Sequence, residues 1–193
     1  MNRLYYYQIN LVGKESLLAD KVFFLIKPDQ IDLFDHTNRH SFVFNEHEIS
    51  AGRIHNSTKI GHEISSYLKK NGLCKRPGIL VFDSSLVVEQ LVCGQDSHID
   101  IASHMHVKAN LNQDWHYQAV LKPGMLLQYQ LLFAQIGTYI EVFTSNMIFD
   151  IQYLLDHTKQ DLRTVDSLIQ LKELANGLEL DLYAKFIKTC DKF

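Results

Sequence analysis

Residues 44–92 decide the fold, and they read FNEHEISAGRIHNSTKIGHEISSYLKKNGLCKRPGILVFDSSLVVEQLV. Asn56 or Ser57 can cap a helix start, because a short polar side chain accepts the first free amide hydrogens of a helix. The apolar face of this helix recurs at helical spacing, at Ile60, Ile64, Tyr67 and Leu68. Asn71-Gly72 predicts the helix end, since glycine readily adopts the left-handed conformation found there. The apolar run after Gly78 then predicts one long strand or two paired strands.

Short strands are expected before this helix. KVFFLI and IDLF flank Lys27-Pro28-Asp29-Gln30, and a proline-led turn between two apolar runs is typical of a hairpin. A polar turn over residues 35–40 leads to a third strand in SFVFNE. These three strands predict an antiparallel meander. The aromatic and branched residues of LYYYQINLV, near the N-terminus, favour one more strand.

Strands and helices alternate after Val92. HIDIA, HMHVKANL and WHYQAVL are expected strands. Lys122-Pro123-Gly124 begins a leucine-rich helix, because proline suits a first helical turn, and Gly137 ends it. TYIEVF favours a strand, and residues 147–157 form the next helix. Strands joined by helices predict an α/β or α+β sheet covered by helices.

Two parts are expected in the chain, a sheet-and-helix domain over residues 1–160 and a helical C-terminal segment over residues 161–193. The C-terminal segment forms one helix or two, since Asn176-Gly177 interrupts its apolar face. The leucines of that face are Leu168, Leu171, Leu174, Leu178 and Leu180. Such a face has more apolar surface than one small domain covers, which favours a homodimer.

Composition excludes several classes of function. The 193 residues carry 19 basic and 22 acidic side chains and a net charge of −3, so there is no electrostatic case for nucleic-acid binding. The three cysteines are unevenly spaced without a CxxC pair, which fits a reducing cytoplasm. The N-terminal stretch resembles neither a signal peptide nor a membrane span. We therefore expect a cytoplasmic protein that reaches a membrane only through a partner.

The sequence contains no GxSxG, HExxH, GxxxxGK[ST] or GxGxxG motif. Its best metal-binding pattern is SHIDIASHMH, in which four candidate ligands share one face of a strand. These are His98, Asp100, His104 and His106. The alternative is an ordinary solvent-facing strand, which we favour because ten histidines make a chance cluster easy. Asp83-Ser84-Ser85 lacks a glycine elbow, so a turn is favoured there over a nucleophile.

The order of three strands, GRIHNSTKIGHEISSYLKKNGL and RPGILVFDSSLVVEQL resembles the actin-like type IV pilus assembly proteins, PilM and its competence relative HofM. Gly52, Ile54 and Asn56 stand at the entry to the helix, and Asp83-Ser84-Ser85 at the strand end. The resemblance covers roughly residues 20 to 157. It implies a small actin-like, ribonuclease H-like fold with a strand-strand-strand-helix-strand subdomain inserted over about residues 44–120, and an incomplete second lobe.

The chain departs from the nucleotide-binding members of that family. Their phosphate hairpin is acidic and rich in small residues, whereas this sequence has Leu25 in place of the acid and Lys27-Pro28-Asp29-Gln30 over the turn. Without small residues the backbone cannot close on phosphate oxygens, and without the acid a metal-bound water has no anchor. We therefore expect no cofactor and no ATP.

Three functions remain open. The resemblance implies a non-enzymatic cytoplasmic scaffold that grips the cytoplasmic tail of an inner-membrane pilus, competence or secretion protein. The residues that we assign to this partner are Phe42, Phe44, Ile79, Val81, Val87 and Val88. The second function is a small metal-dependent enzyme centred on His98, His104 and His106. The third is a nucleotide-binding protein that uses an unrecognised loop. We favour the scaffold.

Overall fold

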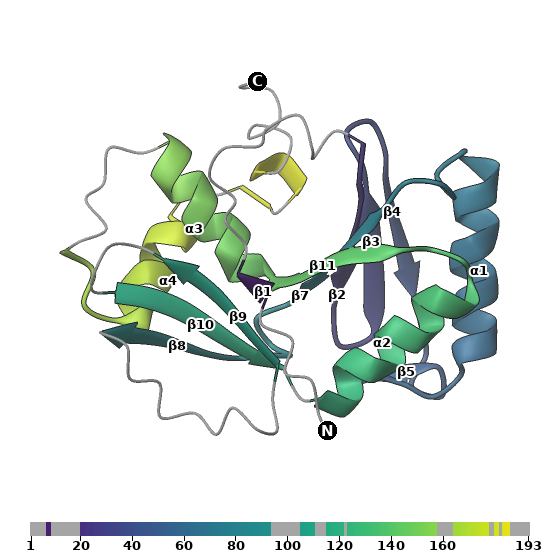
Figure 1. Ribbon diagram of the computed structural model, residues 1–193, viewed down its shortest axis with the longest axis horizontal. Coiled ribbons are helices and arrows are strands. Elements are labelled where there is room, and N and C mark those ends of the chain that lie inside the picture. Colours follow the sequence, from purple (N-terminus) through teal and green to yellow (C-terminus); the bar gives the residue numbers. More distant parts are fainter. Residues whose placement is uncertain are drawn as a thin grey trace.

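The computed structural model describes residues 7–8, 20–93, 105–110, 115–121, 123–157, 164–177, 180–181 and 183–185. Two sheets lie side by side, with helices packed against both (Figure 1). The larger sheet has five strands in the order β11-β7-β2-β3-β4. These strands are β2 (Val22–Ile26), β3 (Gln30–Phe34), β4 (Arg39–Val43), β7 (Gly78–Phe82) and β11 (Ile140–Ser145).

The larger sheet is mixed. β2, β3 and β4 pair antiparallel, which confirms the predicted meander, while β7 pairs parallel to both β2 and β11. Two helices provide the connections that parallel strands need. They are α1 (Ser57–Lys70) and α2 (Pro123–Gln135), which bury apolar residues against one face of this sheet.

The ends of α1 follow the sequence closely. The side chain of Asn56 accepts a hydrogen bond from the amide of Lys59 at 3.1 Å, so Asn56 is the helix cap. Gly72 has a φ of +69°, which makes it the left-handed residue after the helix. Leu73 is buried, and its amide donates to the carbonyl of Leu68 at 2.9 Å. Local residues therefore determine both ends of the helix.

The smaller sheet has the strand order β1-β9-β10-β8. Its strands are β1 (Tyr7–Gln8), β8 (Val88–Cys93), β9 (Met105–Asn110) and β10 (Trp115–Leu121). β10 pairs antiparallel with β8 and β9, and β1 pairs parallel with β9. The sequence predicted one long strand or two paired strands after Gly78, whereas β7 and β8 lie in different sheets and do not pair with each other.

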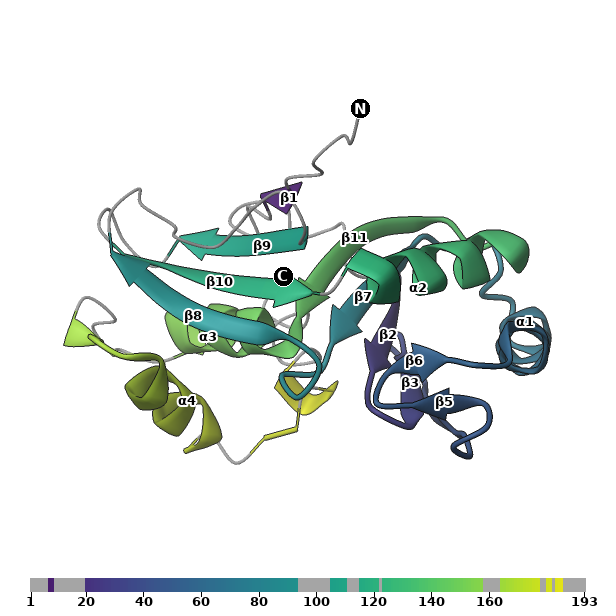
Figure 2. The same ribbon diagram turned by 90° about the horizontal axis from the view of Figure 1, so that it is seen from below.

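Two further helices lie on one side of the smaller sheet (Figure 2). They are α3 (Asn146–His157) and α4 (Leu168–Asn176). α3 begins directly after β11 and also covers the second face of the larger sheet, where Phe149 packs against the cluster that contains Phe23. The main hydrophobic core is a separate cluster that contains residues of both sheets and so extends from one sheet to the other.

The C-terminal leucines pack within the same molecule where the structure describes them. Leu171 is fully buried, and Leu168 and Leu174 pack against the main core. The apolar face that led us to expect a dimer is thus covered there. α4 ends at Asn176, in agreement with the predicted break, while Leu178 lies outside the described residues. The proposed division at residue 160 and the inserted segment over residues 44–120 stay predictions.

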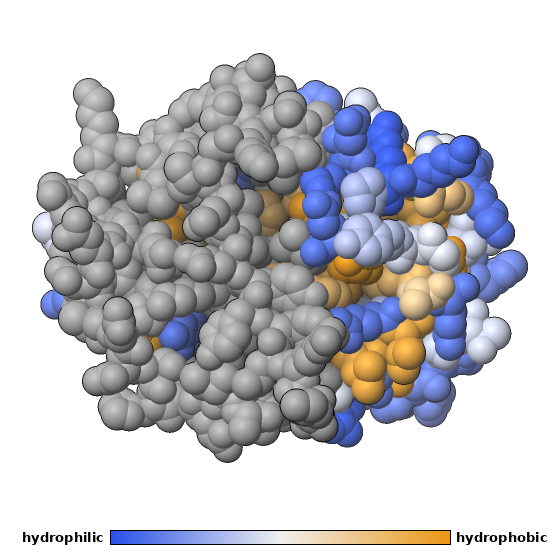
Figure 3. Space-filling model, in the orientation of Figure 1, coloured by the Kyte–Doolittle hydropathy of each residue, from blue (hydrophilic) through white to orange (hydrophobic). Residues whose placement is uncertain are grey.

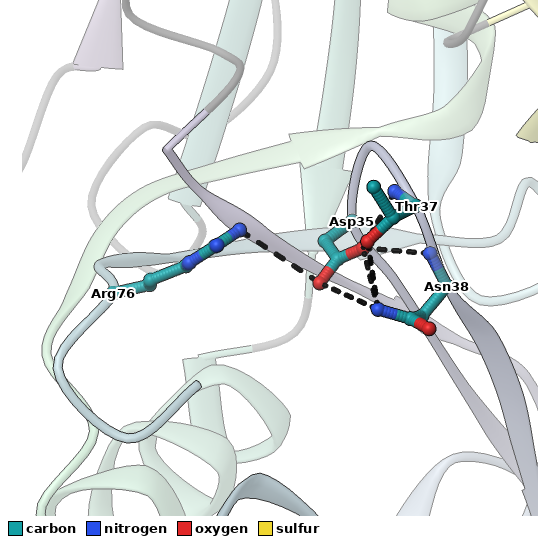
Figure 4. Close-up of polar contacts among 4 residues, drawn as sticks. All are labelled: Asp35, Thr37, Asn38 and Arg76. Carbon is teal, nitrogen blue, oxygen red and sulfur yellow. Dashed lines mark hydrogen bonds and ion pairs between the residues drawn. The ribbon is translucent and has the colours of Figure 1, made fainter. Parts of the chain in front are cut away.

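The turn between β3 and β4 is organised by one buried carboxylate (Figure 4). Oδ1 of Asp35 accepts hydrogen bonds from the amides of Thr37 and Asn38 at 2.8 and 2.7 Å, and from Oγ1 of Thr37 at 3.0 Å. Its Oδ2 lies 3.8 Å from Nη1 of Arg76, which belongs to the link between α1 and β7. Asp35 therefore joins this turn to the link that leads into β7.

The short antiparallel ribbon of β5 (Ile49–Ser50) and β6 (Arg53–Ile54) was not predicted. Ala51 and Gly52 form its turn, both with positive φ. The ribbon contacts α2, since the hydroxyl of Tyr129 donates to the carbonyl of Gly52 at 3.1 Å. Within the described residues, no helix has the length and apolar character needed to cross a membrane.

Candidate functional site

The candidate site lies at the carboxyl ends of the parallel strands of the larger sheet. β2, β7 and β11 end side by side at Ile26, Phe82 and Ser145. Open α/β sheets usually bind ligands outside the carboxyl ends of their parallel strands. Polar residues follow each of these ends here, with Lys27 after β2, Asp83 after β7 and Asn146 after β11.

A buried carboxylate lies at the centre of this region. Oε1 of Glu89 accepts hydrogen bonds from Oγ of Ser84 at 2.7 Å and from the hydroxyl of Tyr117 at 2.6 Å. Its Oε2 forms an ion pair with Nζ of Lys172 at 2.6 Å. The Glu89 side chain is almost fully buried, whereas that of Lys172 is partly exposed. Glu89 therefore connects the β7–β8 turn, β10 and α4.

The same network reaches the ends of β7 and β11. Oγ of Ser84 lies 2.6 Å from Oδ1 of Asn146, and Nδ2 of Asn146 donates to Oδ2 of Asp83 at 3.4 Å. The hydroxyls of Tyr117 and Ser145 are 3.1 Å apart. The polar groups that follow β7 and β11 thus bond to one another and join the two sheets.

Electrostatics keeps this cluster in a hydrogen-bonding role. Burial and the neighbouring charge of Glu89 raise the pKa of Tyr117 far above its usual range, so Tyr117 stays protonated and donates.

Burial also raises the pKa of Asp150, although the hydrogen bond and charge of Lys185 partly oppose this. Nζ of Lys185 lies 2.6 Å from Oδ1 of Asp150.

The arrangement is poorly suited to nucleophilic catalysis. An activated serine needs a base that is free to take its proton. The carboxylate beside Ser84 is already engaged by Tyr117 and Lys172. The predicted turn at Asp83-Ser84-Ser85 is confirmed, because the amide of Ser85 donates to the side chain of Asp83 at 2.9 Å. These residues hold the turn and the sheets together.

The β2–β3 hairpin is the segment that the family resemblance set against the phosphate hairpin of nucleotide-binding members. The amide of Lys27 donates to the carbonyl of Gln30 at 2.9 Å, and Pro28 has no amide hydrogen. The carbonyls of Pro28 and Asp29 accept from the amides of Gly52 and Phe44 at 2.8 and 2.9 Å. The turn is therefore bonded to neighbouring backbone through its carbonyls, and neither Lys27 nor Pro28 has a free amide hydrogen to offer a phosphate. Loss of nucleotide binding remains our expectation.

An acid does lie beside Leu25, on the neighbouring strand. Asp32 of β3 is directly opposite Leu25, is buried, and forms an ion pair with Nζ of Lys27 at 2.7 Å. Burial raises the pKa of Asp32, but hydrogen bonds from Lys27, Ser41 and Gln30 outweigh it and leave the pKa below its ordinary value. This carboxylate is thus committed to an internal ion pair.

The residues assigned to a partner from the sequence do not share one surface. Phe42 and Phe44 are buried in the main core, on the face that α1 covers. Ile79 and Val81 are buried on the opposite face of the sheet, beneath Phe149 and Tyr183. Val87 is partly buried against the main core, and Val88 is 66% exposed. Four of these six side chains therefore lie in the interior, and their role in partner binding stays a prediction.

The histidine pattern falls largely outside the described residues. This holds for His98, Asp100 and His104, while His106 lies in β9, whose backbone alone is described. Within the described ranges no group of three or more His, Cys, Asp or Glu side chains could hold a metal ion. The metal hypothesis stays untested.

Sequence reasoning missed the Glu89 cluster. The one available signal was Glu89 itself, a single acid in the otherwise apolar or neutral strand VVEQLV. A charge at a buried strand position requires a partner. Tyr117 and Lys172 supply it from 28 and 83 residues further along the chain. No local pattern identifies partners at such separations.

No protein-family model and no curated protein sequence matches the chain. Solved structures do. The structure described as the PilM-PilN type IV pilus biogenesis complex aligns with a TM-score of 0.54 at 10% identity, over 71% of this chain and 50% of the other. The cytoplasmic domain of EpsL, an inner membrane component of the type II secretion system of Vibrio cholerae, gives 0.42 at 8% identity, over 67% and 57%. A Bacteroides thetaiotaomicron protein with an actin-like ATPase fold gives 0.35 at 8% identity, over 72% and 58%.

The match to the PilM-PilN complex shows the fold. The chain shares the fold of the chain matched in that complex, and its mixed sheet with packed helices confirms the α/β fold class expected from the sequence. The chain spans only about half the length of the matched chains, between 50% and 58%. At 10% identity the similarity shows the fold alone.

Proposed function

We propose that this chain is a non-enzymatic cytoplasmic scaffold of a type IV pilus, competence or type II secretion-like machine. Its ligand is the cytoplasmic tail of an inner-membrane partner, and that partner holds it at the membrane. The support is its fold, which is similar to that of a structure described as a PilM-PilN complex.

The observation that carries the proposal is the hydrogen bonding of the polar groups at the carboxyl ends of the parallel strands. The polar groups there bond to one another, and the β2–β3 turn bonds to neighbouring backbone. These contacts favour a structural role over phosphate chemistry. An exposed sheet edge remains a suitable docking place for an extended peptide, since such a peptide adds a strand through main-chain hydrogen bonds. The smaller sheet already contains one short parallel segment paired in this way, because β1 pairs with β9.

ATP with magnesium is expected to leave the melting temperature unchanged within about 1 °C, because the β2–β3 turn, Lys27-Pro28-Asp29-Gln30, lacks the small residues that let a backbone close on phosphate. A ligand present at about 100 times its dissociation constant would stabilise the protein by roughly 2.7 kcal/mol, which amounts to several degrees. Thermal shift with ATP, with and without magnesium, measures this. A magnesium-dependent rise of several degrees would support the nucleotide-binding alternative.

Tail binding is tested with labelled peptides. The peptides are the cytoplasmic tails of inner-membrane pilus and secretion proteins from the same organism, each with a scrambled control. We expect one tail to give a saturable rise in fluorescence anisotropy, since an extended peptide gains affinity through main-chain hydrogen bonds to a sheet edge. Protein whose fold is verified by circular dichroism and which binds none of the tails would contradict the scaffold function.

A further inference from the structure

The solvent-facing side of α2 carries no charge. Over its whole length, Pro123 to Gln135, the helix contains no Asp, Glu, Lys, Arg or His. One side is buried in the core through Met125, Leu126, Tyr129, Leu132 and Phe133. The other side nevertheless exposes Leu127 and Leu131, each 54% accessible to solvent. An apolar patch lies over this part of the molecule in Figure 3.

The neighbouring helix, α1, has charged residues on its solvent-facing side, as surface helices usually do. α1 covers the same face of the larger sheet, and its exposed positions include Lys59, Lys69 and Lys70. Surface helices normally place charged residues on the side away from the core. The outer side of α2 departs from that rule, because it exposes leucines beside the neutral amides of Gln128 and Gln135, and exposed apolar residues grouped in this way mark an interaction site.

The exposed residues of α2 form a stripe with coiled-coil spacing. Gly124, Leu127, Leu131 and Ala134 are all exposed and are separated by three, four and three positions. This alternation places residues along one seam of a helix, where a second helix can pack. The two small residues stand at the ends of the stripe and the two leucines at its centre. An added Cβ at Gly124 would meet no atom within 4 Å, so the approach to that end is open.

The stripe is complementary to itself when reversed. Leu127 and Leu131 are equally far along the chain from Tyr129, and so are Gly124 and Ala134. An antiparallel copy of α2, related by a two-fold axis beside Tyr129, therefore sets each leucine against the other leucine of the second copy. It also sets each small end residue against a small end residue. Isologous contacts of symmetric dimers require this self-complementarity.

The surface beyond the end of α2 extends the same face. A shallow open hollow of about 440 Å³ lies there, lined by residues that include Ala134, Thr138, Ile140 and Phe143. Tyr139 borders the hollow and is 72% exposed. In the antiparallel arrangement the beginning of the second copy's α2 points toward this hollow. Tyrosine is among the residue types enriched in protein interfaces.

We propose that this chain forms a symmetric homodimer in which α2 packs antiparallel against α2 of a second copy. The neutral face carries no charge pattern that would select a different, charged partner, whereas its spacing matches itself. A thirteen-residue helix is about 20 Å long, so the contact is smaller than a standard interface. We therefore expect a dissociation constant on the order of tens of micromolar. The proposal is independent of tail binding.

Sedimentation velocity of the full chain tests the dimer. The protein concentration runs from about 1 to 500 µM, a range that brackets the affinity expected for so small an interface. The mass is expected to rise from 22.4 kDa toward twice that value with concentration. Leu131→Asp is expected to remain monomeric throughout. Ile169→Asp is the matched control, because Ile169 is equally apolar, 70% exposed, and lies on α4. Circular dichroism verifies that each variant is folded, as expected for changes at exposed positions.

Charge exchange tests the antiparallel geometry. Leu127→Glu alone and Leu131→Lys alone should each abolish the dimer. The double variant should restore it, since each introduced glutamate then faces an introduced lysine of the second copy. A wild-type protein that stays monomeric at the highest concentration overturns the proposal. So does a dimer that Leu131→Asp leaves intact, or one that the double variant fails to restore. In the last two cases α2 would contact a different protein, or the two copies would pack in another arrangement.

Discussion

Glu89→Ala is expected to lower the free energy of unfolding by about 3–5 kcal/mol, the range for removing one member of a buried charged network. Glu89 accepts hydrogen bonds from Ser84 and Tyr117 and pairs with Lys172. Its loss leaves the buried Tyr117 hydroxyl with Ser145 as its partner among the described residues, and it removes the polar bond between the sheets.

Urea unfolding monitored by circular dichroism measures this effect. Glu89→Gln keeps an acceptor oxygen for Tyr117 and is expected to lose less, about 1–3 kcal/mol, as for a weakened buried hydrogen bond. Glu173→Ala serves as the control, because Glu173 lies exposed on the same helix as Lys172. A change of less than about 1 kcal/mol for Glu89→Ala would show that the cluster contributes only what a surface ion pair does.

The parts of the fold that depend on neighbours in the chain could be predicted from the sequence. The β2–β3 hairpin and both ends of α1 are set by a proline-led turn, by Asn56 and by Gly72. Each of these features acts within a few residues of its own position. Their outcome therefore does not depend on how the rest of the chain packs.

The assignment of strands to sheets could not be predicted in the same way. β7 and β8 are separated by a short turn, yet they enter different sheets, because β7 pairs with β2 and β11 while β8 pairs with β10. Apolar periodicity shows that a strand is buried and does not show which strand lies beside it. The same limit explains why Ile79 and Val81 looked available to a partner although the second face of the sheet is covered by Phe149 and Tyr183.

Asp35→Ala is expected to lower the free energy of unfolding by about 2–4 kcal/mol at neutral pH, since it removes a buried charged acceptor that receives two backbone hydrogen bonds of the turn. The amides of Thr37 and Asn38 both donate to Asp35 Oδ1 in the turn shown in Figure 4. Arg76 would also lose the carboxylate 3.8 Å away. Chemical denaturation at pH 7 measures the loss. Asp29→Ala is the comparison, because Asp29 lies exposed in the other turn of the meander.

The effect of Asp35 should also depend on pH. Burial raises the pKa of Asp35, but the hydrogen bonds from Thr37 and Asn38 outweigh burial and hold the pKa below its ordinary value. The carboxylate therefore stabilises the folded protein above the unfolded-state pKa of about 3.9, and this contribution is lost as the pH falls through the lower folded-state pKa. Asp35→Asn, which keeps the shape and lacks the charge, should be less stable than the wild type at pH 7.

The stability difference between the wild type and Asp35→Asn isolates this residue from the other acids. Asp32 and Asp181 also have lowered pKa values, but they titrate in both proteins and cancel in the difference. The two unfolding curves should therefore approach each other as the pH falls below about 4, the region where aspartates titrate. A difference that stays constant from pH 7 to pH 3, well past the ordinary aspartate pKa, would mean that the two side chains differ in hydrogen-bond geometry or packing and not in charge. In that case the ionic contribution of Asp35, including its interaction with Arg76, would be absent.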